Sequence, residues 1–384
     1  MSNLIEYKLN KIENLKIRGR NVKNAGKNDG PVTLFWAGSG IEVNAKTSEV
    51  WATIESDFDS NEVWLCVFIN GRKISRFMAS KGVSEVCLCR NLNPEKENRI
   101  FLMRDTQPMS GDMGQILKVH SLKVSDGTEF FAVPDGKIKI EFVGDSITSG
   151  EGLAGCPDEW DWISQWISVS ENYAVKTAMA FDADFNIESQ CGWGVVTGWD
   201  NNVHSNMPDY YEYVCGLQNG ECQKNAGSRE LWDFSSFKPD IIFVNLGTND
   251  SSSFSQAPWK DPADGKEYKM RNGDDGKPLE EDALKVSSGI KNFLKKIRKY
   301  NPKARICWIW GMLDLGDFGT YIQKGVDMFI SETGDKNTET FVLTSMECEV
   351  LPEDKGSRGH PGPKTHREAA AKLGDYIRRN LQNC

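Results

Sequence analysis

The second half of the chain alternates short, largely apolar segments with longer amphipathic ones, and this alternation limits the folds that it can adopt. The apolar segments read as buried strands, and the stretches between them show helical periodicity. The predicted strands are Lys137 to Val143, Asp184 to Glu188, Asp240 to Asn245, Arg305 to Trp310 and Phe341 to Leu343, and the predicted helices lie near Glu171 to Phe181, Glu281 to Lys299, Tyr321 to Ile330 and Lys364 to Arg379. Strands joined by crossover helices indicate an α/β fold with a doubly wound, mostly parallel five-stranded sheet.

The first half of the chain shows a different pattern, which is typical of an all-β sandwich. Short runs rich in β-branched and aromatic residues are separated by turn signals. These runs are Val32 to Phe35, Glu49 to Ile54, Glu62 to Ile69 and Glu85 to Cys89. Pro134 and Asp135-Gly136 separate the two patterns. With 384 residues the chain is long enough for two domains. We therefore predict a β-sandwich domain over residues 1–135 and an α/β domain over residues 136–384.

Composition and charge exclude several classes of protein. The chain is 39% hydrophobic and 26% charged, as globular proteins are, and its net charge of −9 disfavours nucleic acid as a partner. It has no run of about 18 apolar residues, so we expect no membrane span. Its four histidines and ten cysteines lack metal-ligand spacing, so we expect no metal and no cofactor. Cys215 and Cys222 are the pair best suited to a loop disulfide.

The N-terminal residues bear on the location of the protein. Residues 1–10 lack the basic start and apolar core of a signal peptide. Most cysteines lie in apolar segments, as reduced thiols do, and both features favour a cytoplasmic location. A secreted protein whose leader had been trimmed would read the same way. The oligomeric state is not encoded in these patterns, and a homo-oligomer is compatible with them.

Three polar side chains follow predicted strands or precede the last helix, in positions suited to acyl transfer. Ser146 follows the first strand of the α/β half, Asn249 follows the third, and His360 lies in a loop rich in Gly and Pro. Because the carboxyl ends of parallel strands share one edge of a sheet, we expect the three side chains to meet there. His360 would then activate Ser146, and fixed donors, including a backbone N–H of residues 191–194, would stabilise the oxyanion.

Four sequence blocks, in their order and approximate spacing, make residues 137–384 resemble the SGNH, or GDSL-like, hydrolases. The blocks are Gly144-Asp145-Ser146, Gly192, Gly247-Thr248-Asn249-Asp250 and His360-Pro361. The resemblance implies a flavodoxin-like α/β fold, with Ser146 as the nucleophile and His360 as the general base. It also implies an oxyanion hole made by the N–H groups of Ser146 and Gly192 and the Asn249 amide, with Gly194 as the alternative to Gly192.

The domain order and a second set of residues narrow this resemblance. Trp232-Asp233-Phe234 and Phe237-Lys238-Pro239-Asp240 look like carbohydrate esterase family 2, and so does a β-rich domain ahead of the SGNH domain. This resemblance implies a jelly-roll sandwich and a serine esterase that removes O-acetyl groups from plant-type oligo- or polysaccharides, of the acetylxylan or acetylmannan type, often at the sugar 6-O position. The implied partner is an acetylated oligosaccharide, and the implied intermediate is an acetyl-enzyme.

One position departs from the pattern of SGNH hydrolases. Most members have an aspartate three residues before the histidine, where this chain has Ser357. A carboxylate there would orient the imidazole and stabilise its charged form. Its absence predicts a Ser-His dyad in which a backbone carbonyl holds His360. Glu353 and Asp354 lie slightly upstream and are the weaker alternatives.

Several other residues carry expectations that the structure can test. Trp193 and Trp199 are candidate sugar platforms, with core packing as the alternative. Asp145 is expected to fix the turn at Ser146. We expect His366 in the first turn of the last helix, exposed to solvent. The polar segment between Asp250 and Leu279 reads as a structureless loop, either the rim of a binding site or a surface insertion.

Other functions are compatible with the same sequence blocks. A lipase or thioesterase of the same family would act on longer acyl chains, and a carbohydrate-binding protein with a decayed site would not be catalytic. An α/β-hydrolase is disfavoured because Thr148 stands where its elbow needs glycine. A nucleotide-binding flavodoxin-like module is disfavoured because the turn at Ser146 has no phosphate-cradling glycine run.

Overall fold

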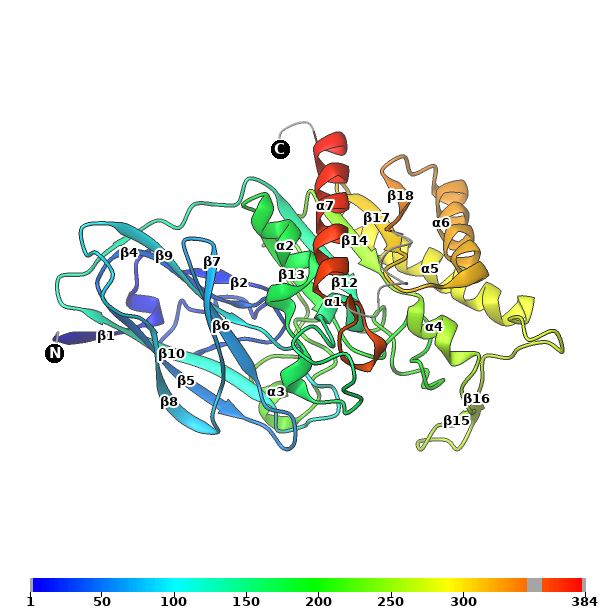
Figure 1. Cartoon of the computed structure of the whole chain (residues 1–384), viewed down its shortest axis with the longest axis horizontal. Coiled ribbons are helices and arrows are strands. Elements are labelled where there is room, and N and C mark those ends of the chain that lie inside the picture. Colours follow the sequence, from blue (N-terminus) through cyan, green and yellow to red (C-terminus); the bar gives the residue numbers. More distant parts are fainter. Residues whose placement is uncertain (1–2, 344–353, 382–384) are drawn as a thin grey trace.

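Residues 4–131 form two antiparallel sheets that stack as a β-sandwich (Figure 1). The computed structural model describes residues 3–343 and 354–381. The strands are β1 Leu4–Lys8, β2 Lys16–Arg18, β3 Val32–Thr33, β4 Gly40–Lys46, β5 Val50–Asp57, β6 Trp64–Ile69, β7 Arg72–Met78, β8 Gly82–Cys89, β9 Glu97–Arg104, β10 Ile116–Ser125 and β11 Glu129–Phe131. One sheet has the order β1-β10-β5-β8 with β3 beside β10, and the other has the order β11-β4-β9-β6-β7 with β2 beside β4. The predicted all-β half is confirmed.

The core of the sandwich follows from the alternation of side chains along its strands. In β5, Val50, Ala52 and Ile54 are buried, whereas Trp51 and Thr53 between them are half-buried. Successive side chains of a strand point to opposite faces, so one face of each sheet supplies the core. Buried residues of both sheets join in a single hydrophobic cluster.

The second half of the chain is a three-layer α/β structure. Its main strands are β12 Lys139–Gly144, β13 Asp184–Ser189, β14 Ile241–Asn245, β17 Arg305–Trp310 and β18 Thr338–Val342, and its helices are α1 Ser146–Ser149, α2 Tyr173–Ala180, α3 Glu221–Asn225, α4 Thr248–Ser253, α5 Glu280–Tyr300, α6 Gly319–Thr333 and α7 Pro363–Asn380. All neighbouring strands are parallel, in the order β13-β12-β14-β17-β18. This confirms the predicted sheet. The strand order reverses at β12, and open α/β sheets bind ligands outside the carboxyl ends of their strands at such a point.

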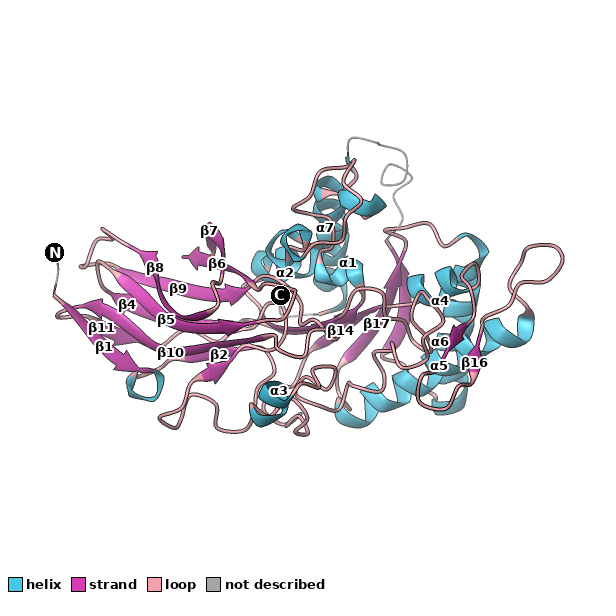
Figure 2. Cartoon of the chain, turned by 90° about the horizontal axis from the view of Figure 1, so that it is seen from below, coloured by secondary structure: helices cyan, strands magenta, loops and turns pink. Residues whose placement is uncertain are grey.

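The layers follow from burial on both faces of the sheet. In β14, Ile242 and Val244 belong to one hydrophobic cluster with α5 and α6, whereas Ile241 and Phe243 belong to another with α2 and α7. A parallel strand covered by helices on both faces is therefore apolar throughout. Figure 2 shows the sandwich strands on one side of the molecule and most of the helices on the other. None of the helices in the described ranges is long and apolar enough to cross a membrane.

The polar segment after α4 is not a structureless loop, because part of it forms a hairpin. In this hairpin β15 Trp259–Lys260 pairs with β16 Glu267–Tyr268. His204 contacts this hairpin in two ways. Its Nε2 lies 2.7 Å from an oxygen of Asp261, and its ring packs edge-on against Trp259. That this segment rims a binding site stays a prediction.

Buried polar contacts join the two halves of the chain. The guanidinium of Arg20 is fully buried and pairs with Glu188 at 2.9 Å and Glu141 at 3.3 Å. Trp36 Nε1 donates to the carbonyl of Val214 at 2.6 Å. Breaking one partner of a buried ion pair is costly, so these contacts fix the halves against each other. The predicted domain boundary at 135/136 falls between β11 and β12 and stays a prediction.

The expected disulfide between Cys215 and Cys222 is wrong. Both are free thiols. Cys215 is buried in the core of the α/β half, and Cys222 Sγ donates to the carbonyl of Met113 at 3.5 Å. The two side chains therefore have separate surroundings, which their spacing in the sequence does not show.

Candidate active site

Ser146 lies just beyond the carboxyl end of β12, where it begins the short helix α1. The carboxylate of Asp145 caps this helix by accepting the N–H of Ile147 at 3.0 Å. Burial raises the pKa of Asp145 to about 7, and the nearby charges of Asp250 and Glu151 act in the same direction. Asp145 thus fixes the turn, as predicted.

His360 reaches the same edge of the sheet from the loop before α7. A 3-10 turn, Ser357–Gly359, precedes it, and the N–H of Ser357 donates to the carbonyl of Gly152 at 3.0 Å. Gly152 has a φ of +82°, and a Cβ there would lie 2.6 Å from the carbonyl oxygen of Ser357, so this approach requires glycine. As a result, His360 Nε2 lies 2.9 Å from Ser146 Oγ. The structure therefore brings together the two residues that the sequence pairs.

The other imidazole nitrogen of His360 finds no support among the described residues. Nδ1 is buried and has no hydrogen-bond partner within the described part of the chain, so the predicted backbone carbonyl is not found there. The hydroxyl of Ser357 is buried and also lacks a partner among residues 3–343 and 354–381. Asp354 instead caps α7 by accepting the N–H groups of Lys364 and Thr365, each at 2.7 Å. Glu353 lies outside the described residues. Neither Ser357 nor Asp354 orients the imidazole.

A carboxylate that the sequence analysis missed lies close to the reactive nitrogen. One oxygen of Glu151 is 3.6 Å from His360 Nε2, and the other accepts from Arg358 Nε at 3.1 Å. Glu151 is only 5% exposed. The available signal was a single charged residue between two glycines, five residues after Ser146.

Asn249 comes from the start of α4, next to the nucleophile turn. Its Nδ2 donates to the carbonyl of Trp193 at 2.8 Å and lies 3.3 Å from the carboxylate of Asp145. The adjacent Asp250 is buried and accepts the N–H of Val195 at 2.8 Å. The asparagine block thus contacts both the serine block and the glycine block. Three segments from different strand ends therefore share one place.

Two backbone N–H groups at this place are free to bind an anion. Gly192 has a φ of +79°, and within the described residues its N–H has no internal acceptor. The same holds for the N–H of Ser146. The N–H of Gly194, in contrast, donates to the carbonyl of Ser205 at 3.2 Å. Of the two candidate glycines, Gly192 is the one whose N–H is available.

Gln107 of the β-sandwich half ties these segments together. Its side-chain oxygen accepts from the hydroxyl of Ser149 at 2.7 Å and from the N–H of Cys191 at 2.8 Å. Gln107 is fully buried. No site residue was predicted in this half, because a lone glutamine carries no motif. The first half of the chain nevertheless helps to build the site.

The candidate tryptophans differ in exposure. Trp193 is 8% exposed and packs on Tyr210 with ring centroids 5.0 Å apart, which favours the alternative of core packing; its role as a sugar platform stays a prediction. Trp199 is 50% exposed, and its backbone N–H donates to the carbonyl of Gly192 at 3.0 Å. Trp160 is 69% exposed, and its carbonyl accepts from Arg358 Nη1 at 3.0 Å. Exposed aromatic rings therefore belong to segments that contact the glycine block and the histidine loop.

His366 lies in the first turn of α7, as predicted, but it is buried instead of exposed. Its Nδ1 accepts the N–H of Tyr173 at 3.1 Å, and its ring stacks on the ring of Tyr173. Burial lowers the pKa of His366 to about 3, so the imidazole is neutral. The packing of α2 on α7 covers this residue, and the sequence of α7 alone does not show it.

The two remaining histidines lie in pairs with carboxylates. His120 Nε2 is 2.8 Å from Glu55, and His204 Nε2 is 2.7 Å from Asp261. Across residues 3–343 and 354–381, no three His, Cys, Asp or Glu side chains are placed to hold a metal ion together.

Residues 140–373 match the family model of the GDSL-like lipase/acylhydrolases. The chain therefore belongs to the GDSL-like lipase/acylhydrolase family. The match covers the serine, glycine, asparagine and histidine blocks that meet at the sheet edge, and it confirms the family resemblance that the sequence indicated.

Solved structures share the two-part architecture of the whole chain. An acetyl xylan esterase (Est2A) from the rumen bacterium Butyrivibrio proteoclasticus is 42% identical, with a TM-score of 0.93 over 99% of both chains. A family two carbohydrate esterase from Clostridium thermocellum, solved with cellohexaose, is 22% identical, with a TM-score of 0.76 over 96% of this chain and 100% of that chain. These similarities confirm the resemblance to carbohydrate esterase family 2.

Curated relatives are more distant and longer than the matched region. Cellulase/esterase CelE of Acetivibrio thermocellus is 26% identical over 356 residues, which are 90% of this chain and 37% of CelE. An acetylxylan esterase / glucomannan deacetylase of Cellvibrio japonicus is 26% identical over 226 residues, which are 58% of each protein. The chain thus matches less than two thirds of the length of either relative.

Proposed function

We propose that this protein is a serine esterase that removes O-acetyl groups from plant-type oligo- or polysaccharides of the acetylxylan or acetylmannan type. The observation that carries the proposal is the distance of 2.9 Å between Ser146 Oγ and His360 Nε2 at the switch point of the parallel sheet. The 42% identity to an acetyl xylan esterase over almost the whole chain supports an acetylated sugar as the substrate.

Acylation follows from the geometry of the site. Ser146 Oγ attacks the acetyl carbonyl while His360 Nε2 takes the hydroxyl proton. The N–H groups of Ser146 and Gly192 donate to the oxyanion that develops, and the amide of Asn249 joins them when its Nδ2 gives up the 3.3 Å contact with Asp145. His360 then returns the proton to the sugar oxygen, which leaves as a hydroxyl group. The acetyl group stays on Ser146.

Deacylation uses the same groups in reverse. A water molecule gives a proton to His360 Nε2 and attacks the acetyl carbonyl of the acyl-enzyme. The same donors bind the second oxyanion, and acetate leaves as the proton returns to Ser146 Oγ.

The base acts in this proposal as the histidine of a Ser-His dyad. When Nε2 accepts from Ser146, the ring proton is on Nδ1, where no described group accepts it. A triad aspartate would stabilise the imidazolium at that nitrogen. Here the Glu151 carboxylate, 3.6 Å from Nε2, supplies negative charge on the other side of the ring.

The surroundings of the site favour a sugar over a long acyl chain. Trp160 and Trp199 are exposed aromatic rings, and aromatic faces stack on the carbon faces of sugars. Glu151, Arg358 and Asn249 add polar and charged groups where a lipase would need an apolar groove. An acetylated oligosaccharide is therefore the partner that we propose.

The decisive experiment is acetate release from acetylated xylo-, manno- and gluco-oligosaccharides. Ser146→Ala should lower kcat by roughly 10⁴-fold or more. Ser331→Ala, a matched change at an exposed serine outside the site, should keep full activity. Undiminished release by Ser146→Ala would overturn the catalytic assignment. A wild-type protein that binds these sugars but releases no acetate would instead be a non-catalytic carbohydrate-binding protein.

A second assay separates the esterase from a lipase or thioesterase. Rates on acetyl and octanoyl nitrophenyl esters are compared with the same enzyme preparation. We expect the acetyl ester to be the better substrate, because polar groups and tryptophans border the site. A marked preference for octanoate would contradict the acetylesterase assignment.

A further inference from the structure

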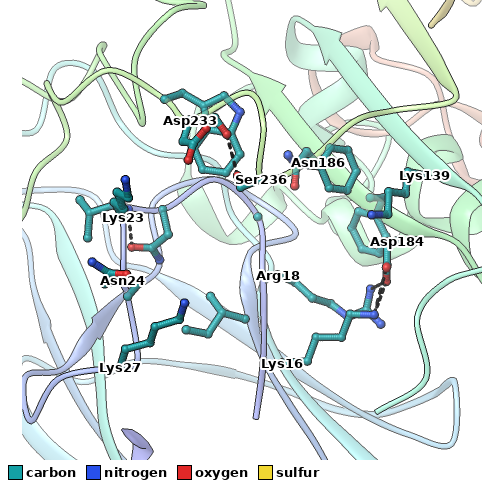
Figure 3. Close-up of a pocket in the computed structure, with 18 of the residues that line it drawn as sticks. Lys16, Arg18, Lys23, Asn24, Lys27, Lys139, Asp184, Asn186, Asp233 and Ser236 are labelled. Carbon is teal, nitrogen blue, oxygen red and sulfur yellow. Dashed lines mark hydrogen bonds and ion pairs between the residues drawn. The ribbon is translucent and has the colours of Figure 1, made fainter. Parts of the chain in front are cut away.

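A separate cavity of about 410 Å³ lies at the opposite edge of the parallel sheet (Figure 3). Lys139 and Asp184, the first residues of β12 and β13, line it. Ser146 follows the far end of β12, and a strand rises about 3.3 Å per residue, so the serine is roughly 20 Å away. The cavity is therefore distinct from the proposed catalytic site, and its volume suits a small ligand.

Three parts of the fold form the walls of this cavity. Residues 16–27 of the sandwich half line one side, the starts of β12 and β13 line another, and residues 232–237 close it. In Figure 3, Lys23, Asn24 and Lys27 lie across the cavity from Lys139 and Asn186. The cavity thus lies at the junction of the two halves, where small-molecule sites are common.

The lining carries more positive than negative charge, although the whole chain has a net charge of −9. Two of its cations already have carboxylate partners, because Lys16 and Arg18 both pair with Asp184, at 2.7 and 2.8 Å. Lys16 also pairs with Asp135 at 3.3 Å, and Arg18 with Glu42 at 2.5 Å. Hydrogen bonds from Ser235 lower the pKa of the Asp233 carboxyl, and the nearby charge of Lys23 adds to this effect. Three lysines of the lining have no ion pair within the described residues, namely Lys23, Lys27 and Lys139.

Two buried hydrogen-bond donors of the lining have no acceptor in the described structure. Asn186 is only 2% exposed, and its Nδ2 has no partner. The indole Nε1 of Trp232 is also buried without a partner. An unpaired buried donor costs about 1–3 kcal/mol, and such groups are rare in folded proteins. Both atoms lie just beneath the surface of the lining, so a ligand with acceptor oxygens would satisfy them once the side chains over them move aside.

We propose that this cavity binds an acidic sugar, that is, a small sugar that carries a carboxylate. The carboxylate would lie near Lys23 and Lys27, and hydroxyl or ring oxygens would accept from Asn186 and Trp232. Trp232 and Phe237 provide aromatic surface for the carbon face of the sugar. The choice of a sugar rests on the proposed function, whereas the need for an anion with acceptor oxygens rests on the cavity alone. Such a site would hold an acidic polysaccharide at a distance from the catalytic serine.

Titration of the full chain with sodium glucuronate tests the proposal. Glucose is the neutral control, and inorganic phosphate is the competing anion. Calorimetry should show glucuronate binding at least about tenfold more tightly than glucose. The affinity should fall as sodium chloride is raised, because salt screens the exposed lysines. Of the indole N–H resonances of the 12 tryptophans, the one that Trp232→Phe removes should shift on binding.

Two double variants, one in the cavity lining and one outside it, show whether glucuronate binds in the cavity. Lys23→Gln/Lys27→Gln should weaken glucuronate binding at least about tenfold. The matched control, Lys303→Gln/Lys336→Gln, changes two exposed lysines outside the lining and should bind like wild type. Equal binding by the first double variant, or no saturable binding of glucuronate by the wild type, would overturn the proposal. Phosphate binding that is lost in this variant, without glucuronate binding, would also overturn it and leave a site for inorganic anions.

The two proposals can fail separately. Hydrolysis of a nitrophenyl acetate by Lys23→Gln/Lys27→Gln should equal that of wild type, because neither lysine is near Ser146. If the wild-type protein lacks esterase activity, the proposed function fails while the glucuronate titration still tests the cavity.

Discussion

The nucleophile turn and the histidine loop meet in one hydrogen bond, but they are held in different ways. Ser146 follows a central strand, and buried side chains brace its turn, with Asp145 as the cap and Gln107 and Asn249 bound to the adjacent segments. His360 depends on backbone contacts of its loop, and its Nδ1 has no partner within the described residues. The fold therefore preorganises the serine side of the site, whereas the histidine side relies on loop packing and on the charge of Glu151.

Among the residues that support the nucleophile, the largest effect is expected for Asn249→Ala. This change removes one of the three proposed oxyanion donors, and loss of such a donor costs about 10²–10³ in kcat. KM should change little, because the interaction strengthens in the transition state. Steady-state kinetics on a nitrophenyl acetate, with a thermal melt as the folding control, measure this. A loss below about threefold would mean that Asn249 only braces the turn.

The bracing itself is tested by Gln107→Leu. The change leaves the hydroxyl of Ser149 and the N–H of Cys191 buried without their acceptor, so the free energy of unfolding should fall by about 2–3 kcal/mol. Urea denaturation measures the loss. Gln165→Leu, at an exposed glutamine, is the matched control and should stay within about 0.5 kcal/mol of wild type. Equal stability of the two variants would contradict the bracing role of Gln107.

His366 in α7, the helix that follows the histidine loop, should make the free energy of unfolding depend on pH. Burial lowers the pKa of His366 to about 3 from an unfolded value near 6.5, so the neutral ring stabilises the fold above pH 6.5, and this stability is lost as pH falls. The loss from His366 approaches about 1.4 kcal/mol per pH unit between pH 6 and 4. His366→Gln should remove this part of the slope.

The wild-type slope also contains opposing groups, which the variant keeps. The pKa values of Asp145 and Asp250 are raised by burial, to about 7 and about 6, so their contribution to stability is greatest at low pH and is lost as pH rises. The difference between wild type and His366→Gln in urea denaturation at pH 7, 6, 5 and 4 therefore isolates the histidine. Parallel slopes would show that His366 does not titrate in this range.

The smallest effect is expected for Glu151→Gln on the histidine side. Removing the carboxylate near Nε2 should lower kcat by roughly tenfold, because the imidazolium loses a nearby negative charge. Arg358→Gln keeps this charge but removes the ion partner of Glu151, so it separates the charge effect from bracing of the loop. We expect Arg358→Gln to retain more activity than Glu151→Gln in the same assay. Equal losses would assign Glu151 a bracing role instead.

The fold was largely predictable because its strands are buried on one or both faces. Apolar runs such as Asp240 to Asn245 and periodic stretches such as Glu281 to Lys299 report burial locally, and both became elements within a residue of the expected ends. Ser146, Asn249 and His360 were predictable as a set because parallel strands deliver their carboxyl ends to one edge.

The errors concern contacts between distant segments. His366 is covered by α2 and Cys215 lies in the core, and neither environment leaves a local pattern in the sequence. Gln107 lies some 40 residues before Ser149, in the other half of the chain, so it has no motif to identify it.

The sequence by itself determined the class of fold, the identity of the reacting side chains and the order in which the chain presents them, because strand burial and motif spacing are local properties. Only the tertiary structure decided what holds those side chains in place. It placed a carboxylate near His360 Nε2, brought Gln107 into the site, and formed the cationic cavity at the far edge of the sheet. These features depend on side chains from separate halves or loops, and their proximity is set by packing.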